Sequence, residues 1–218
     1  MGKKFLVIGV GRFGRSVIRE LHSMNHDVVA VDVTPSLLEE IDPYTNHTMI
    51  GDATDDALLA ELNVLNYDGV VVSIGDNTLG AILIVKKLKK LGCKRILSKA
   101  NSETIGEILG EVGAHNVVYP EAETGVRVAR KLANPGLLEV IELAPHFVGI
   151  EMQVPEDFVG KTLSELQFRR KYRATVVMVA KPGGKPNVSP NPDDTLEEGD
   201  LIFVVGDTDD LERLKRKV

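Results

Sequence analysis

Apolar runs alternate with helical patterns along the first 134 residues of the chain. Six runs have the length and β-branched content of strands, and apolar residues at helical spacing follow each of them. We predict strands at 5–8, 28–31, 48–50, 69–74, 96–99 and 117–119, and helices at 13–24, 35–41, 58–62, 79–91, 105–112 and 120–132. This alternation predicts an α/β fold, a Rossmann-like doubly wound parallel sheet with helices on both faces.

The alternation stops at Asn134-Pro135-Gly136, so we predict a domain boundary there. Residues 1–134 would form the first domain, and residues 137–218 the second. The second domain has strand patterns at 148–154, 174–180 and 201–205, with helical patterns at 163–171 and 209–216. This order of elements predicts a small α+β domain.

A glycine-rich turn follows the first predicted strand and leads directly into the first predicted helix. Gly9, Gly11 and Gly14 have the Gly-x-Gly-x-x-Gly spacing, and Asp32 ends the next strand 18 positions beyond Gly14. In this pattern the glycines permit a sharp turn, close approach of a phosphate and close packing of the helix on the strand. The phosphate binds to the free amides of the helix N-terminus. The pattern therefore predicts a nucleotide site, with a ligand-free glycine turn as the alternative.

Polar residues at other strand ends extend the candidate site. Asp32 is placed to accept hydrogen bonds from a ribose, and its charge would repel the 2′-phosphate of NADP. Asp52, Asp76 and Asn77 follow the carboxyl ends of predicted strands, where a doubly wound sheet binds ligands, although each could instead cap the next helix. Arg12 lies inside the glycine turn, where a guanidinium could bind phosphate oxygens or point away from them.

Composition narrows the function classes. The 218 residues carry a net charge of −6 and a pI near 5.4, which argues against a nucleic-acid backbone as partner. Cys93 is the only cysteine, so an internal disulfide and a cysteine zinc knuckle are excluded. No apolar run reaches the 18 to 20 or so residues that a membrane helix needs. We expect a soluble, cytoplasmic protein.

Two other segments resemble binding motifs. Residues 155–162 imitate a P-loop, but Pro155 stands where the first glycine is required, and Thr162 with Glu165 instead predicts a capping box. The lysines at 86–90 are expected to form a solvated helix face, with a basic binding patch as the alternative.

The sequence offers no convincing catalytic group. His146 is the only histidine of the second domain, and no tyrosine is followed by a lysine four residues later. We therefore expect a ligand sensor and not an enzyme. An NAD-dependent oxidoreductase is the alternative, and a redox-sensing NAD binder acting on transcription is a third reading.

Taken together, the motifs resemble the RCK (KTN) regulatory subunits of bacterial potassium uptake systems, the KtrA and TrkA type. The first domain carries this resemblance at Val7 to Gly14, Ala30-Val31-Asp32, Asp52-Ala53-Thr54, Val72 to Gly75, and Tyr119-Pro120-Glu121 followed by Gly125. In the second domain it rests on Gly160 to Leu166, Arg169 to Tyr172, and Gly199-Asp200. The resemblance covers essentially the whole chain and implies an RCK-N domain followed by an RCK-C domain.

The resemblance also implies a site in the first domain for an adenine nucleotide, with ATP or ADP preferred and AMP or NAD(H) as alternatives. The implied contact residues are Gly9, Gly11, Arg12, Phe13, Gly14, Asp32, Asp52, Ala53, Thr54, Ile74, Gly75, Asp76, Asn77 and Lys99. Glu121 matches an acidic residue that binds a divalent cation between subunits in KtrA-like proteins.

Further implications concern partners. The resemblance implies dimers that assemble into an octameric ring, of this chain alone or with a related RCK chain. The ring would dock on a membrane potassium channel or transporter at the inner face of the cell membrane. Some relatives bind cyclic di-AMP in the second domain, for which Arg169 is the candidate contact.

Overall fold

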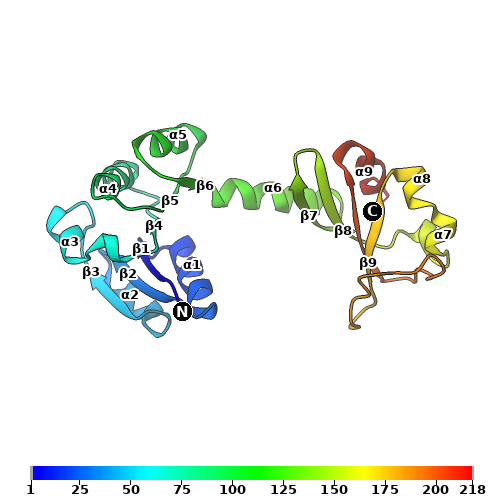
Figure 1. Ribbon diagram of the computed structural model, residues 1–218, viewed down its shortest axis with the longest axis horizontal. Coiled ribbons are helices and arrows are strands. Elements are labelled where there is room, and N and C mark those ends of the chain that lie inside the picture. The colour runs from blue at the N-terminus through cyan, green and yellow to red at the C-terminus, as the bar shows by residue number, and fades with distance from the viewer. Residues whose placement is uncertain (1, 218) are drawn as a thin grey trace. The chain divides into compact units, whose positions relative to one another are not determined.

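The computed structural model describes residues 2–217 and contains two compact units (Figure 1). Met1, the first residue of the first predicted domain, and Val218, the last residue of the second, lie outside the described residues. The units divide between Glu123 and Thr124, inside helix α6 (Pro120–Ala133). Each unit has its own apolar core and is described by itself.

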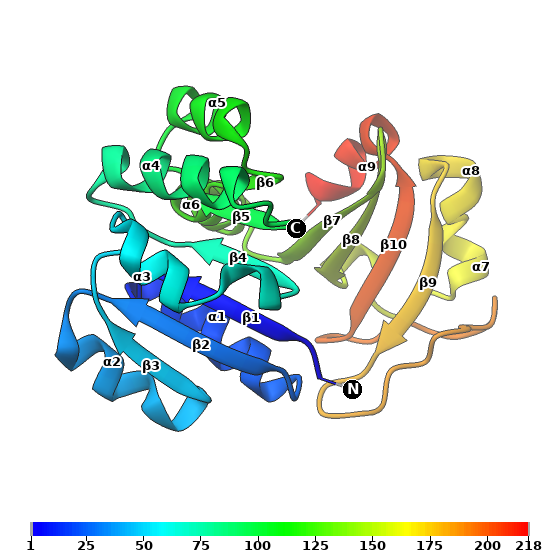
Figure 2. The same ribbon diagram turned by 60° about the vertical axis from the view of Figure 1, so that its left-hand side comes forward.

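The first unit is built on a six-stranded parallel sheet (Figure 2). Its strands are β1 (Lys4–Ile8), β2 (Asp27–Asp32), β3 (His47–Ile50), β4 (Gly69–Val72), β5 (Ile96–Lys99) and β6 (Asn116–Val118). Their order is β3-β2-β1-β4-β5-β6, with every pair parallel. This order confirms the predicted doubly wound sheet. The strands follow one another outward from β1 to β3 on one side and from β4 to β6 on the other, so the direction of winding reverses between β1 and β4.

Helices cover both faces of this sheet. They are α1 (Arg12–Ser23), α2 (Pro35–Ile41), α3 (Asp56–Glu61), α4 (Thr78–Lys90) and α5 (Glu103–Val112), with short 3-10 turns η1 (Asp42–Tyr44) and η2 (Val64–Asn66). Helices α3, α4 and α5 pack on one face, and α1 and α2 on the other. Every residue of β4 is buried, as expected for a central parallel strand.

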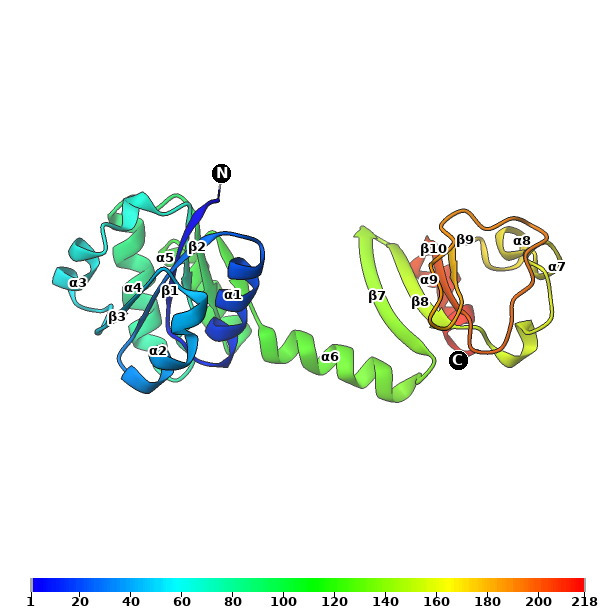
Figure 3. The same ribbon diagram turned by 90° about the horizontal axis from the view of Figure 1, so that it is seen from below.

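The second unit contains a four-stranded antiparallel sheet (Figure 3). Its strands are β7 (Leu137–Ala144), β8 (Phe147–Gln153), β9 (Thr175–Ala180) and β10 (Leu201–Asp207), in the order β7-β8-β10-β9. Side chains of η3 (Glu156–Phe158), α7 (Leu163–Leu166), α8 (Phe168–Tyr172) and α9 (Thr208–Lys215) share an apolar core with the strands. The last three strands agree with the sequence pattern.

The structure corrects two expectations in the second unit. Strand β7 was not predicted, because bulges after Leu137 and after Glu142 interrupt its alternation of apolar and polar residues. The helix predicted at 163–171 is two short helices, since Gln167 adopts a left-handed conformation with φ of 50°.

Among residues 2–217, no helix has the length and hydropathy needed to cross a bilayer.

Candidate functional site

The turn between β1 and α1 has the backbone geometry that its glycines predict. Gly9 has φ of +93°, and a β-carbon there would lie 3.0 Å from the carbonyl carbon and oxygen of Ser73. A β-carbon on Gly14 would overlap the carbonyl oxygen of Gly9, so this helix residue must be glycine for α1 to pack on the turn. By contrast, no atom lies within 4 Å of a β-carbon built on Gly11, the N-cap of α1.

No side chain caps the N-terminus of α1, and its first turn contains no acidic residue. The same is true of α2, whose N-cap residue Thr34 makes no capping hydrogen bond. In the same unit, Asn77 accepts a hydrogen bond from the amide of Gly80 and caps α4, while Ser102 caps α5. The amides at the start of α1 are therefore free to donate to an anion.

Asp32 connects the end of β2 to this turn. Its Oδ2 accepts a hydrogen bond of 2.7 Å from the amide of Val10, and its Oδ1 accepts one of 2.8 Å from the amide of Thr34. Each carboxylate oxygen can accept more than one hydrogen bond, so Asp32 retains acceptor capacity for a hydroxyl group. The two backbone contacts fix the orientation of this carboxylate.

A cavity of about 400 Å³ opens at this edge of the sheet. Ten predicted site residues line it: Gly9, Gly11, Asp32, Asp52, Ala53, Thr54, Ile74, Gly75, Asp76 and Asn77. Seven residues that were not among the predicted contacts line it as well, and three of them, Ile8, Val31 and Ser73, lie inside the sequence motifs: Ile8, Val31, Val33, Thr34, Leu37, Gly51 and Ser73. The cavity combines apolar walls with backbone and carboxylate groups, a combination typical of a small-molecule site.

Ser73 is the most informative of the unpredicted residues. Its hydroxyl is buried and has no hydrogen-bond partner among residues 2–217, although it lies close to the amide-rich turn, 3.0 Å from a β-carbon built on Gly14. A buried hydroxyl without a partner costs free energy, so a ligand that reaches it would gain a hydrogen bond. The signal for Ser73 in the sequence is its place in the Val72 to Gly75 motif, and the structure puts it directly after β4.

Two polar residues of the cavity also have local structural roles. Asp52 accepts a hydrogen bond of 2.8 Å from the amide of Thr54, and this bond, with Lys87 as a weaker cause, lowers the pKa of the Asp52 carboxyl. Asn77 caps α4, as the alternative reading of its position predicted. Because both side chains line the cavity, the helix-capping and ligand-binding readings are compatible.

Lys99 and Glu121 form an ion pair near the cavity. The ammonium nitrogen of Lys99 lies 2.7 Å from Oε1 of Glu121 and 3.3 Å from a β-carbon built on the cavity residue Gly75. The pKa of Glu121 is lowered chiefly by the hydrogen bond from Lys99, with a further contribution from the charge of Arg12. The structure therefore joins two predicted residues, Lys99 and Glu121, in an ion pair, and the charge of Arg12 acts on the same carboxyl.

The remaining predicted residues lie beside the cavity without lining it. The side chain of Arg12 is exposed at the start of α1, and Phe13 packs on the apolar core under that helix. Gly14 is buried in the helix.

Within the described residues 2–217, no group of three or more His, Cys, Asp or Glu side chains could hold a metal ion.

The second unit has a cavity of its own, of about 460 Å³. It lies between α7, α8, the start of β9 and the loop that contains Pro190 and Pro192. Arg169 and Arg170 line it together with apolar groups such as Phe168. The candidate residue Arg169 is thus at a cavity, with a second arginine beside it.

Comparison with known proteins identifies the family. The TrkA-N domain matches residues 5–120, and the TrkA-C domain matches residues 148–218. The chain belongs to the TrkA-N/TrkA-C family. This membership confirms the resemblance to regulatory subunits of bacterial potassium uptake systems.

Among its relatives, this family member is 33% identical to the Ktr system potassium uptake protein C of Bacillus subtilis (strain 168), over 100% of this chain and 98% of that protein. It is 35% identical to the Ktr system potassium uptake protein A of Vibrio alginolyticus, over 96% of this chain and 94% of the relative. Both similarities cover the two domains.

Solved structures of related fold include the GsuK channel, with a TM-score of 0.71 and 21% identity over all of this chain. The GsuK channel bound to NAD gives a TM-score of 0.67 and 20% identity over the same range. The chain spans only 40% and 39% of the length of those two chains. The AMP-bound form of the Shewanella denitrificans Kef CTD matches 60% of this chain and 79% of its own, with a TM-score of 0.54 and 22% identity.

Proposed function

We propose that this TrkA-family chain is a nucleotide-sensing regulatory subunit of a potassium channel or transporter, without catalytic activity. The observation that carries the proposal is the cavity at the uncapped start of α1, in a family member similar over its whole length to Ktr potassium uptake proteins. The free amides suit a phosphate, and Asp32 suits a ribose. Structures of similar fold are bound to NAD or to AMP, which supports an adenine nucleotide in this cavity.

The nucleotide would lie with its phosphates at Gly9, Gly11 and the start of α1. Lys99 lies beside the cavity residue Gly75, and Arg12 is the first residue of α1, so their positive charges would face the end of the phosphate chain. ATP and ADP share the adenosine contacts and differ in the γ-phosphate. Only groups that touch this phosphate can favour one conformation of the regulatory assembly over another.

We propose ATP and ADP as the preferred ligands, with AMP and NAD(H) as alternatives. Native mass spectrometry of the purified chain would identify the retained nucleotide and the oligomeric state together. Titration calorimetry with ATP, ADP, AMP and NADH should then give the tightest binding to ATP or ADP. Turnover of NADH with small carbonyl substrates would contradict the regulatory role and favour an oxidoreductase.

Replacing Arg12 tests how the terminal phosphate is sensed. The variant Arg12→Ala should bind ADP nearly as tightly as the wild type but lose its preference for ATP, because an exposed guanidinium at this position has the γ-phosphate as its partner. Calorimetry with both nucleotides measures the difference. Arg19→Ala, an exposed arginine two turns along α1, is the matched control. An equal loss of ATP and ADP affinity in Arg12→Ala would contradict this role.

The assembly is proposed from the family. Dimers of this chain would form an octameric ring, alone or with a related RCK chain, and dock on a membrane potassium channel or transporter subunit. The ring would open or close the pore of that channel. To shift the channel from mostly closed to mostly open, the nucleotide must bind one conformation of the ring more tightly than the other by roughly 5.5 kcal/mol, which several symmetric sites can supply together. The chain would then be cytoplasmic and held at the inner membrane face by its partner.

Two additional ligands are part of the proposal. A divalent cation would bind at Glu121 between subunits, where its carboxylate now contacts Lys99. Since residues 2–217 hold no group of three or more His, Cys, Asp or Glu side chains that could bind a metal ion, the remaining ligands would come from nucleotide phosphates and a second subunit. Cyclic di-AMP would occupy the cavity beside Arg169 in the second domain. Calorimetry with Mg²⁺ and with cyclic di-AMP, on the wild type, Glu121→Gln and Arg169→Ala, tests each ligand separately.

A further inference from the structure

A run of basic residues in the first unit has no role in the nucleotide site. Residues 86–95 contain five lysines and one arginine and no acidic residue, in a chain of net charge −6. Lys87 is engaged, because its ammonium nitrogen donates to the carbonyl oxygen of Thr54 at 2.6 Å and pairs with Asp56 at 2.8 Å. The other five have exposed side chains and no ion pair within the described part of the chain, and we call them the basic edge: Lys86, Lys89, Lys90, Lys94 and Arg95.

The basic edge lies opposite the nucleotide cavity. Helix α4 begins beside the cavity at Asn77 and runs back to the amino ends of the strands, where Arg95 accepts a backbone hydrogen bond of 2.9 Å from Val70. The cavity lies at the carboxyl ends of the same strands. A ligand of the basic edge and a nucleotide can therefore bind at the same time. Lys94 and Arg95 also lie beyond the end of α4, so pairing with the helix dipole does not account for them.

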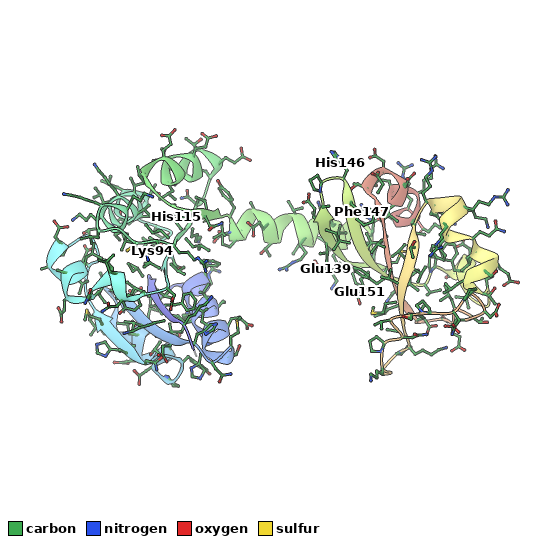
Figure 4. The ribbon with its side chains drawn as sticks, viewed as in Figure 1. Lys94, His115, Glu139, His146, Phe147 and Glu151 are labelled. Atoms are coloured by element: carbon green, nitrogen blue, oxygen red, sulfur yellow. The ribbon has the colours of Figure 1, made fainter. Side chains whose placement is uncertain are left out.

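A neighbouring loop brings a histidine to the basic edge. Figure 4 labels Lys94 and His115, which belong to the loops that lead into β5 and β6. The ring nitrogen Nδ1 of His115 accepts a hydrogen bond of 3.1 Å from the amide of Ile96, two residues after Lys94. The stem of Lys89 lies against Gly113 in the same loop as His115. Residues of α4 and of two loops thus come together at this edge, where the lysines and Arg95 carry the charge.

Exposed leucines lie among these charges. The side chain of Leu91 is 44% exposed between Lys90 and Lys94, and that of Leu65, in η2, is 62% exposed. Leu65 reaches the same loop, since its Cδ2 lies 3.7 Å from a β-carbon built on Gly92. A cluster of lysines with apolar side chains between them is the pattern of a surface that binds the headgroup region of a membrane.

We propose that the basic edge, with Leu65 and Leu91, binds the surface of a bilayer that contains anionic phospholipid. Four of its five cations are lysines, which attract a diffuse layer of negative charge without the fork geometry that an arginine offers to a single phosphate. The exposed leucines favour a bilayer over an acidic protein or a nucleic acid, because only the bilayer offers an apolar layer directly beneath the charge. This surface gives the chain a membrane contact that needs no partner protein.

Vesicle co-sedimentation of the full chain tests the proposal. Vesicles of phosphatidylcholine with 30% phosphatidylglycerol should bind the wild type, whereas pure phosphatidylcholine vesicles and 0.5 M NaCl should abolish binding. Each lysine contributes about fivefold, so the triple variant Lys89→Gln, Lys90→Gln, Lys94→Gln should bind roughly a hundredfold more weakly. The matched control replaces Lys131, Lys171 and Lys185, which are equally exposed in the second unit, and should bind like the wild type.

A second variant separates a bilayer from other anionic partners. Leu65→Ser with Leu91→Ser should weaken vesicle binding several-fold and leave binding to polyglutamate or duplex DNA unchanged. The proposal is overturned if the control and test lysine variants lose binding equally, if neutral vesicles bind as well, or if the leucine variant binds vesicles like the wild type. Unchanged nucleotide affinity and thermal midpoint in the triple variant show that the fold and the nucleotide site are intact.

Discussion

The two units begin comparable helices in opposite ways. In the first unit, Gly11 precedes α1 and leaves its first amides without a capping side chain. In the second unit, Gly160 also precedes a helix, but Thr162 and Glu165 form a capping box that satisfies the amides at the start of α7. The amides that follow Gly11 are thus left open to a ligand, whereas the start of α7 is already capped by the chain itself.

The largest effect is expected from capping α1. The variant Gly11→Asp has room for its side chain, since nothing lies within 4 Å of the β-carbon, and the backbone φ of −67° suits any residue. The carboxylate should stabilise the unliganded chain by about 0.5–1 kcal/mol and weaken nucleotide binding by roughly a hundredfold through charge repulsion. Thermal unfolding and calorimetry measure the two effects.

Controls distinguish charge from size at this position. Gly11→Ala adds a β-carbon without charge and should weaken binding much less than Gly11→Asp. Gly110→Asp places the same charge at another open glycine, on α5, and should leave nucleotide affinity unchanged. Wild-type affinity in Gly11→Asp would show that the phosphates do not bind at the start of α1.

A smaller effect is expected at Ser73. Removing its partnerless hydroxyl in Ser73→Ala should leave the unliganded chain as stable as the wild type or up to about 1 kcal/mol more stable. Nucleotide affinity should fall about five- to tenfold, because the ligand loses a hydrogen-bond partner. Ser98→Ala, at a buried serine of the neighbouring strand β5, is the control and should not change affinity. A stability loss in Ser73→Ala with unchanged affinity would count against this role.

A variant of the capping box in the second unit should change stability and leave nucleotide affinity unchanged, the opposite of what is expected at Ser73. Thr162→Ala should lower the free energy of unfolding of that unit by about 1 kcal/mol without changing nucleotide affinity. Denaturant unfolding measures the first quantity and calorimetry the second. Ser189→Ala, in an exposed loop, is the control. A stability equal to that of the wild type would show that the capping box contributes nothing measurable.

The smallest effect depends on pH. Hydrogen bonds from the amide and the hydroxyl of Thr162 lower the pKa of Glu165 from its usual 4.5. The contribution of Glu165 to stability is therefore present above its unfolded-state pKa and is lost as the pH falls through the lowered, folded-state pKa. The wild type should be slightly more stable than Glu165→Gln at pH 7, and the two should converge in acid. A difference in thermal midpoint that stays constant from pH 7 to pH 3 would contradict this assignment.

The fold of the first unit was predictable because its elements have strong local patterns. β4 contains three consecutive Val residues and is buried throughout. α4 ends at Lys90, and Gly92, two residues later, has the positive φ of +89° that is typical after a helix end. In the second unit, β7 escaped prediction because two bulges break its period. The division of α7 from α8 at Gln167 has no comparable signal, since glutamine rarely adopts a positive φ.

The site was predictable where a residue type is demanded by geometry. Gly9, with its positive φ, and Asp32, with its contact to the glycine turn, are of this kind. Leu37, and Ser73 although it lies in the Val72 to Gly75 motif, were not predicted as contacts. Many residue types suit their local backbone, and only the packing of β4 and α2 brings them to the cavity. The ion pair of Lys99 with Glu121 likewise depends on the adjacency of β5 and β6.

The central position of β1 also determines when the first unit can fold during synthesis. β1 pairs with β2 on one side and with β4 on the other, and the partner of Phe5 in β4 is Gly69. At about 5–20 residues per second, the ribosome needs roughly 3–13 s to extend the chain from Phe5 to Gly69, and during this time one side of β1 is an unpaired edge. Its apolar residues, which are buried in the folded unit, stay exposed on that side until β4 emerges. Synthesis rate is therefore expected to affect the yield of this unit more than that of the second, whose neighbouring strands β7 and β8 pair locally.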